Sequence, residues 1–205
     1  MPKDTFMKLK PNKKEKIIEA TIKELSLHPY EHVNLANIIR DAGIARGSFY
    51  QYFSDKDDLY MFFTMVISEK KGEFFKDIFD MSQDLPFLDR FKAIYIRGFE
   101  FAKAYPELVK AGYNMTQSSL FRSSDLYKAS YESGIQFFES LIKIDQQKKR
   151  IRSSIDARFL AESILDYMNK MNLDYYIHTS ESLDDIKLRT DAIIDILKKG
   201  IVDHV

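Results

Sequence analysis

With 205 residues, the chain is long enough for one large domain or for a small domain joined to a medium one. It carries 31 Lys and Arg against 31 Asp and Glu, so its zero net charge gives no global attraction to nucleic acid, and its lack of cysteine excludes disulfides, thiolate metal sites and cysteine nucleophiles. Gly and Pro number only 7 and 5, which favours long helices over a fold with many turns.

The start of the chain concentrates positive charge, with lysines at positions 3, 8, 10, 13, 14 and 16. Such a basic arm can attract DNA over a Debye length of about 8–10 Å, even from a neutral protein. A solvated, frayed terminus explains the same residues equally well. The segment lacks the apolar stretch of a signal peptide, and no segment has the roughly eighteen apolar residues of a membrane span, so we expect a cytoplasmic protein with no membrane partner.

Apolar residues recur at helical spacing along most of the chain. Taken in order, they predict helices over residues 13–27, 35–41, 45–52, 56–81, 87–104, 106–115, 125–144, 156–178 and 183–202. The expected N-caps include Asn12, Asn34 and Asp55, and Gly43 is expected to take a positive φ in a tight turn. The polar segment 117–124 is predicted to be a loop. No alternating stretch indicates a strand, so we predict an all-α fold.

The stretch from Val33 to Leu59 has the pattern of a helix-turn-helix, in which two short helices are joined by a glycine-containing turn and the second enters the major groove of DNA. We expect apolar side chains to pack the two helices together, namely Ile38, Ile39, Ile44, Phe49 and Phe53. The other face of the second helix is then largely exposed, with Ala45, Arg46, Ser48, Tyr50, Gln51 and Tyr52. Small residues at positions 45, 47 and 48 let the start of this helix approach DNA closely.

This stretch resembles the signature of TetR-type transcriptional regulators: a capped helix, an Ala-Gly-aliphatic turn, a Gly-small-aromatic-Tyr helix and a Phe-x-x-Lys-acidic-acidic-Leu segment that ends at Leu59. The helix predicted over residues 13–27 also fits the first helix of that family. The remaining chain is similar to the family only in length and helicity. The resemblance implies an N-terminal three-helix helix-turn-helix domain for DNA binding, over residues 1–56, and a C-terminal helical bundle for dimerisation and effector binding, over residues 57–205.

The resemblance suggests roles that the chemistry of the side chains supports. Arg46 is the best candidate for reading a guanine, because a guanidinium can donate two hydrogen bonds to O6 and N7. Gln51 would read adenine or contact the DNA backbone, and Asn34 and Lys56 would bind phosphates. The full expected DNA-binding set is Asn34, Ala45, Arg46, Gly47, Ser48, Tyr50, Gln51, Tyr52 and Lys56.

Each of these residues also has a purely structural explanation. Arg46 could pair with Asp41, and Asn34 could be an N-cap alone. The two tyrosines of the second helix could be half-buried packing residues. Two departures from the family pattern, Ala45 where Ser or Thr is common and Tyr52 where His is common, leave the base preference undetermined.

A single short recognition helix contacts only a few base pairs, whereas specific protein–DNA affinities are about 10⁻⁸–10⁻¹¹ M. We therefore expect a homodimer that places two recognition helices about 34 Å apart on a palindromic operator of double-stranded DNA. The last two predicted helices are the expected interface, through Leu160, Ile164, Met168, Met171, Ile186, Ile193, Ile194, Leu197 and Ile201. An ordinary intramolecular core is the alternative, since an amphipathic stripe does not show which molecule covers it.

Aromatic residues of the middle helices are candidates for lining a pocket for a small-molecule effector. The expected set is Tyr95, Phe99, Tyr113, Met115, Phe121, Phe138 and Tyr167. Aromatic residues at helical spacing also form ordinary cores. The resemblance implies that a ligand changes the separation of the recognition helices and releases DNA, which requires tighter binding to the DNA-incompetent state.

An enzyme is the main alternative from another class of protein. The four histidines show no metal-binding spacing, and the sequence has neither a glycine-rich phosphate loop nor a Gly-x-Ser-x-Gly elbow. We therefore expect a repressor with no catalytic, metal or cofactor site. A ligand-independent DNA-binding protein, for example one that organises chromosomes, and an activator remain open.

Overall fold

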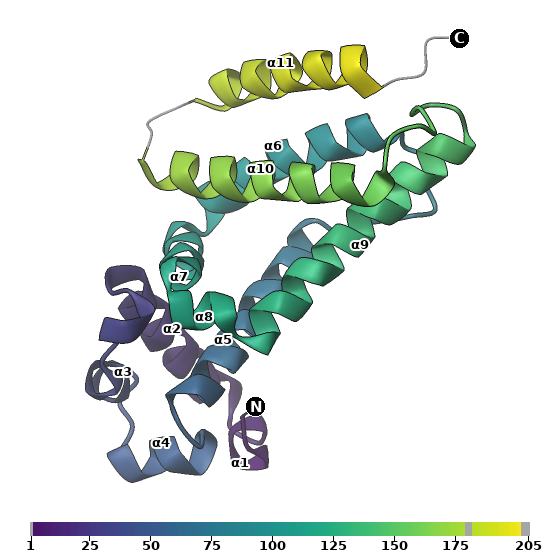
Figure 1. Ribbon diagram of the computed structural model, residues 1–205. Helices are drawn as coiled ribbons and strands as arrows, with labels where there is room; N and C mark the ends of the chain where they lie inside the picture. The colour runs from purple at the N-terminus through teal and green to yellow at the C-terminus, as the bar shows by residue number, and fades with distance from the viewer. Residues whose placement is uncertain (1, 179–181, 202–205) are drawn as a thin grey trace. The chain divides into compact units, whose positions relative to one another are not determined.

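The computed structural model describes the backbone of residues 2–178 and 182–201 and the side chains of residues 2–169 and 182–201. Within these ranges the regular structure is helical, which confirms the predicted all-α fold (Figure 1). The elements are α1 (Asp4–Met7), α2 (Pro11–Leu27), a 3-10 helix η1 (Tyr30–His32), α3 (Leu35–Asp41), α4 (Arg46–Tyr52), α5 (Lys56–Phe74), α6 (Phe87–Ala104), α7 (Pro106–Gln117), α8 (Ser119–Ser123), α9 (Asp125–Gln147), α10 (Ala157–His178) and α11 (Leu183–Ile201). Among the described residues, every helix is too short or too polar to span a membrane.

The structure differs from the predicted elements at several helix ends. Helix α2 begins at Pro11 rather than after an Asn12 cap, because proline at the first helical position has no N–H that needs a partner. Helix α5 ends at Phe74, before residue 81. The predicted loop 117–124 contains α8, capped by the Ser118 hydroxyl, which accepts from the N–H of Phe121 at 3.2 Å.

Contacts between residues divide the chain into two compact units. The first unit consists of residues up to Phe74 together with Tyr105–Tyr127, and it contains α1 to α5, α7 and α8. The second unit contains α6, α10, α11 and most of α9. These units are defined by packing, so the division of function at residue 56 stays a prediction.

In the first unit, α2 is the central helix and packs against α3, α5 and α7. Helix α7 is tied to the end of α2 by Asn114, whose side-chain amide donates to the carbonyls of Leu25 and Ser26 at 2.9 and 3.1 Å. The core of this unit is formed by Phe6, Ile17, Leu25, Ile38, Phe49, Phe53, Leu59, Phe63 and Met115. The helix-turn-helix is therefore one face of a larger packed unit.

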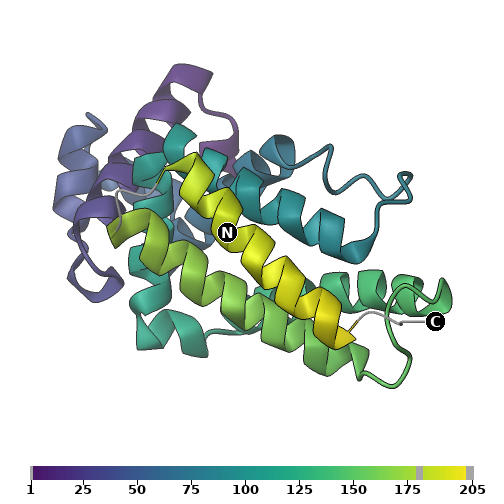
Figure 2. The same cartoon turned by 90° about the horizontal axis from the view of Figure 1, so that it is seen from above.

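In the second unit, α6 contacts both α10 and α11, and the latter two run antiparallel (Figure 2). Its core includes Phe87, Phe91, Tyr95 and Phe99 of α6, Phe138 and Leu141 of α9, Leu160 and Ile164 of α10, and Ile186 and Ile194 of α11. The segment before α6 is held by the buried Arg90, whose guanidinium donates to the carbonyls of Ile78, Asp80 and Gln83. A single buried cation therefore fixes a segment that has no regular structure of its own.

Candidate nucleic-acid interface

The turn between α3 and α4 has the local geometry that the sequence predicts. The Asn34 side chain accepts a hydrogen bond from the N–H of Ala36 at 2.9 Å, which caps α3. Gly43 has a φ of 64°, a conformation that glycine adopts without steric cost. Phe49 and Ile38 are fully buried and pack α3 and α4 into the core of the unit. The start of α4 is therefore set by the turn that precedes it and by packing, and its N-cap residue, Ala45, makes no side-chain hydrogen bond.

Helix α4 presents a continuous exposed face. Arg46, Gly47, Tyr50 and Gln51 are all exposed, as is Ala45, the residue just before the helix. Tyr50 leaves 46% of its surface accessible, although its ring is large and apolar. Ser48 is half-buried. An exposed row of an arginine, an aromatic ring and an amide beside a glycine has the residue types that contact base edges and phosphates in a major groove.

Arg46 does not form the ion pair with Asp41 that would have explained it structurally. The carboxylate of Asp41 instead accepts from Lys23 at 2.8 Å and from Arg40 at 2.9 Å. These two hydrogen bonds, that of Lys23 first, hold the pKa of Asp41 below its usual value. Among the described residues Arg46 has no ion-pair partner, so its guanidinium is available to a partner outside the chain.

The predicted exposure of Tyr52 is wrong. Only 5% of its surface is accessible, because its ring lies edge-on against Phe6 with the centroids 6.1 Å apart, and the ammonium of Lys13 lies 5.6 Å from the ring centroid. Both contacts come from α1 and the start of α2. Tyr52 is therefore a packing residue at the end of the recognition helix.

The two predicted phosphate ligands outside α4 are already engaged within the chain. The Lys56 ammonium donates to the carbonyl of Tyr30 at 2.6 Å and lies 5.1 Å from the centroid of that ring. Its partial burial lowers its pKa. The backbone N–H of Asn34 donates to the Glu24 carboxylate at 2.9 Å. Phosphate binding by Lys56 and Asn34 therefore stays a prediction that would require them to contact DNA while keeping these partners.

Gly47 provides a test of close approach to DNA. A Cβ built at Gly47 meets no atom within 4 Å, so no contact inside the chain requires glycine there. Alanine in a helix is more stable than glycine by roughly 0.5–1 kcal/mol, and we expect Gly47→Ala to stabilise the fold by about that amount in chemical denaturation. The same methyl group would stand between α4 and the groove, so we expect the variant to bind its operator at least tenfold more weakly.

Gly72 in α5 supplies the matched control for this substitution. It is also exposed and helical, and its Cβ would likewise meet open space. We expect Gly72→Ala to bind operator like the unmodified protein. Full operator affinity in Gly47→Ala would show that this face of α4 does not approach DNA closely.

The predicted effector residues are divided between the two units. Tyr113, Met115 and Phe121 belong to the first unit. The others, Tyr95, Phe99, Phe138 and Tyr167, belong to the second, where Tyr95, Phe99 and Phe138 are buried in the core. Their part in an effector pocket stays a prediction.

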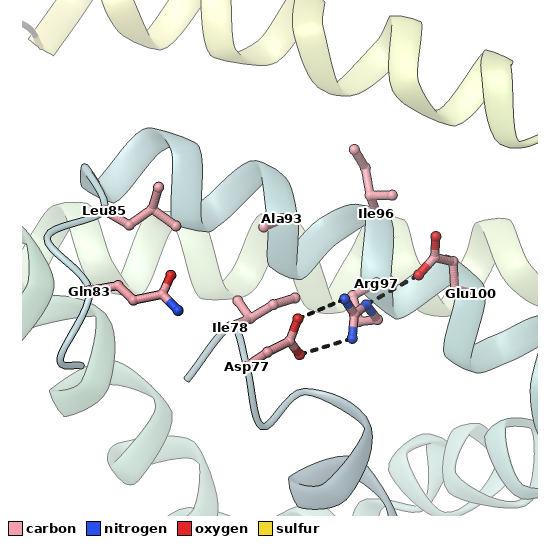
Figure 3. Close-up of a pocket in the computed structure, with 8 residues that line it drawn as sticks. All are labelled: Asp77, Ile78, Gln83, Leu85, Ala93, Ile96, Arg97 and Glu100. Atoms are coloured by element: carbon pink, nitrogen blue, oxygen red, sulfur yellow. Dashed lines mark hydrogen bonds and ion pairs between the residues drawn. The ribbon is translucent and has the colours of Figure 1, made fainter. Parts of the chain in front are cut away.

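An open pocket of about 340 Å³ in the second unit has a different lining, shown in Figure 3. Residues Asp77–Leu85 and α6 contribute Asp77, Ile78, Gln83, Leu85, Ala93, Ile96, Arg97 and Glu100. Two of its walls are joined by Arg97, which forms ion pairs with Asp77 at 3.0 Å and Glu100 at 3.2 Å. The pocket contains none of the predicted effector residues, and both of its carboxylates are paired with the single guanidinium of Arg97.

Most of the residues predicted to form the dimer interface lie in the core of the second unit. Leu160, Ile164, Met168, Ile186, Ile194 and Ile201 are all buried within the single chain, whereas Ile193 and Leu197 are half-buried. The side chain of Met171 lies outside the described residues. Among the described side chains of α10 and α11, the large apolar residues that are exposed are others: Phe159, Leu188 and Ile196, at 69%, 71% and 68% accessible.

Sequence reasoning missed the N-terminal residues that contact the recognition helix. Helix α1 has only four residues, too few for a hydrophobic period to be detected. The signal that was present is Phe6, an isolated aromatic residue in a lysine-rich segment, which is 1% accessible in the structure. Residues 3–6 therefore pack against α4.

Comparison with known proteins agrees with this architecture. Residues 17–61 match the model of bacterial regulatory proteins of the tetR family. The chain is 23% identical over 213 residues to YvdT, an uncharacterized HTH-type transcriptional regulator of Bacillus subtilis, and the match covers 98% of both chains.

Solved structures share the fold over nearly the whole chain. A TetR family transcriptional regulator from Chloroflexus aurantiacus superposes with a TM-score of 0.72 at 21% identity, covering 98% of each chain. FadR from Bacillus subtilis, solved in complex with stearoyl-CoA, superposes with a TM-score of 0.73 at 17% identity, covering 91% of this chain and 98% of its own. The resemblance seen in the sequence is thus confirmed: residues 17–61 match the model of the tetR family of bacterial regulatory proteins, and the chain has the fold of TetR-family transcriptional regulators.

Proposed function

We propose that this protein is a transcriptional repressor of the cytoplasm that binds a palindromic operator as a homodimer and is released by a small-molecule effector. The observation that carries the proposal is the exposed face of α4, where Arg46, Tyr50 and Gln51 point away from the core of a capped helix-turn-helix. Tyr50 contacts the ring of Phe49 with one edge, and the rest of this face is left to solvent. Its place in a tetR-family domain supports a function in reading DNA rather than in catalysis.

Within this proposal the residues of α4 have separate roles. Arg46 reads a guanine through two hydrogen bonds, and Gln51 contacts an adenine or the DNA backbone. Tyr50 contacts a phosphate or a thymine methyl, and Ala45 and Gly47 let the helix approach the groove. We assign no DNA contact to the buried ring of Tyr52.

For the homodimer, we propose the exposed face of α10 and α11. Leu188 and Ile196 are eight residues apart on α11, with Ala192 midway between them, so all three lie on one face of the helix. Phe159 adds an exposed ring from α10. A two-fold axis through such a patch would bury apolar surface that the single chain leaves in water.

For the effector, we propose an amphipathic molecule of the acyl-CoA class. The support is the fold similarity to FadR, which was solved with stearoyl-CoA, together with the aromatic core of the second unit. A ligand that releases DNA must bind the DNA-incompetent state more tightly, and thermodynamic linkage requires DNA to weaken ligand binding by the same factor.

A titration tests the effector proposal. Operator duplex is first selected with the unmodified protein, and its affinity is then measured with stearoyl-CoA, free CoA or stearate present. We expect stearoyl-CoA to lower the affinity at least tenfold, and free CoA to have little effect because it lacks the acyl chain. Operator binding that ignores all three compounds would overturn the acyl-CoA class.

A further inference from the structure

The C-terminal end of α4 is completed by residues from the start of the chain. A helix leaves its last carbonyls without partners inside the helix, and a glycine in the left-handed conformation often satisfies them. Helix α4 has no such cap, because Phe53 follows in an extended conformation and its N–H reaches only the carbonyl of Phe49. The carbonyls of Tyr50, Gln51 and Tyr52 therefore need other donors.

Residues 3 and 5 provide a donor for each of these carbonyls. The Lys3 ammonium donates to the carbonyl of Tyr50 at 2.8 Å, and the backbone N–H of Lys3 donates to the carbonyl of Tyr52 at 2.8 Å. The Thr5 hydroxyl donates to the carbonyl of Gln51. The ammonium also stands at the negative end of the helix dipole, where positive charge is favourable.

Phe6 anchors this arrangement in the core. Its ring centroid lies 5.0 Å from that of Phe53 and 4.7 Å from that of Phe62, and almost none of its surface is accessible. Figure 1 shows α1 beside the end of α4. The N-terminal segment is therefore anchored in the core directly after the residues that make these hydrogen bonds.

We propose that Lys3 and Thr5 are positioning residues for the recognition helix, and that residues 3–6 form a clasp that keeps α4 helical to its last turn. This inference rests on the proposed function in DNA reading. A helix of seven residues is far below the length at which helices are stable alone, so its exposed side chains hold a fixed geometry only when both ends are supported. The turn at Gly43 and the buried ring of Phe49 support its start, and the clasp supports its end.

A basic DNA-binding arm is the competing use of this segment, and Lys8 separates the two. Its side chain is exposed and has no partner among the described residues. Lys8→Met therefore removes the same charge as Lys3→Met from the same segment while leaving α4 capped. Thr5→Val removes the hydroxyl without any change of charge, and Thr5→Ser restores it.

The test combines amide hydrogen exchange of the free protein with affinities for a selected operator and for a random duplex. We expect Lys3→Met and Thr5→Val to speed exchange at residues 51–53 by roughly threefold to tenfold, the range for losing one hydrogen bond. Both should weaken operator binding more than random binding, with the melting temperature nearly unchanged. Lys3→Arg and Thr5→Ser should restore the operator preference, and Lys8→Met should leave exchange unchanged.

Two results would overturn the clasp. One is unchanged exchange at the end of α4 in both Lys3→Met and Thr5→Val. The other is an equal loss of affinity for both duplexes in Lys3→Met and Lys8→Met, which would assign the segment to phosphate attraction. If the unmodified protein binds no duplex at all, the proposed function fails, while the exchange rates still decide whether residues 3–6 support α4.

Discussion

Replacing Leu188 and Ile196 together with glutamate is expected to give folded monomers with operator affinity lower by about 10²–10⁴-fold, the usual gain from linking two binding modules. Both side chains are more than two-thirds accessible in the single chain, so the substitutions leave the core intact. In a two-fold dimer through this face the glutamates of both copies would be buried in one interface, where desolvation and like-charge repulsion oppose association. Sedimentation equilibrium and operator titration measure the two effects.

Two further variants separate this interface from the alternatives. Leu120→Glu adds a charge at a residue of α8 that is equally exposed, and we expect it to remain dimeric with full affinity. Ile194→Glu places a charge in the core of the second unit, where the side chain is 6% accessible, so it should unfold that unit rather than yield a folded monomer. Intact dimers in the Leu188 and Ile196 variant would place the interface on another surface.

Arg46→Ala has the second large expected effect. We expect it to lose about 1–3 kcal/mol of DNA-binding free energy, and only on duplexes that keep the preferred base at one position of each half-site. The reason is that a guanidinium donates two parallel hydrogen bonds to guanine, and these distinguish it from the other bases. Binding to duplexes altered at that position should change little. Titration of the variant against a panel of single-base operator changes would show this loss of discrimination.

Arg40 is the matched control within the same motif. Its side chain is exposed, but its guanidinium is paired with Asp41, so Arg40→Ala removes an equal charge from α3 without removing a base contact. Arg46→Lys keeps the charge and loses the planar fork, and we expect it to behave like Arg46→Ala in base preference. If Arg46→Ala lost the same affinity for every DNA sequence, or if Arg40→Ala changed binding in the same way, Arg46 would contact phosphate only.

The features that sequence predicted well are those set by neighbouring residues. The bounds of α3 and α6 agree with the prediction, the Asn34 side chain caps α3, and Gly43 has the positive φ that its turn requires. Caps, turns and long amphipathic helices depend on side chains within a few positions of one another. Interactions between neighbouring residues therefore determine these features, and the local sequence is enough to predict them.

The features that sequence missed depend on contacts between distant residues. Tyr52 was expected to be exposed because nothing in α4 covers it. In the structure its ring contacts Phe6 and Lys13, which lie roughly forty positions or more before it in the sequence. The apolar stripe of α11 was predicted to form a dimer interface. Its spacing is the same whether it packs against another chain or against α6 of its own chain, so the sequence pattern does not distinguish the two. Burial in the single chain shows that Ile186 and Ile194 meet their own core.

Selection of bound DNA from a random pool tests the central claim most directly. If the exposed face of α4 reads the major groove from a two-fold dimer, the enriched sequences will contain two inverted half-sites whose centres are about one helical turn, or a multiple of one, apart. The Arg46→Ala protein will then select the same spacing with one base position relaxed. A pool that shows no enrichment at low ionic strength would contradict the assignment of this face to DNA.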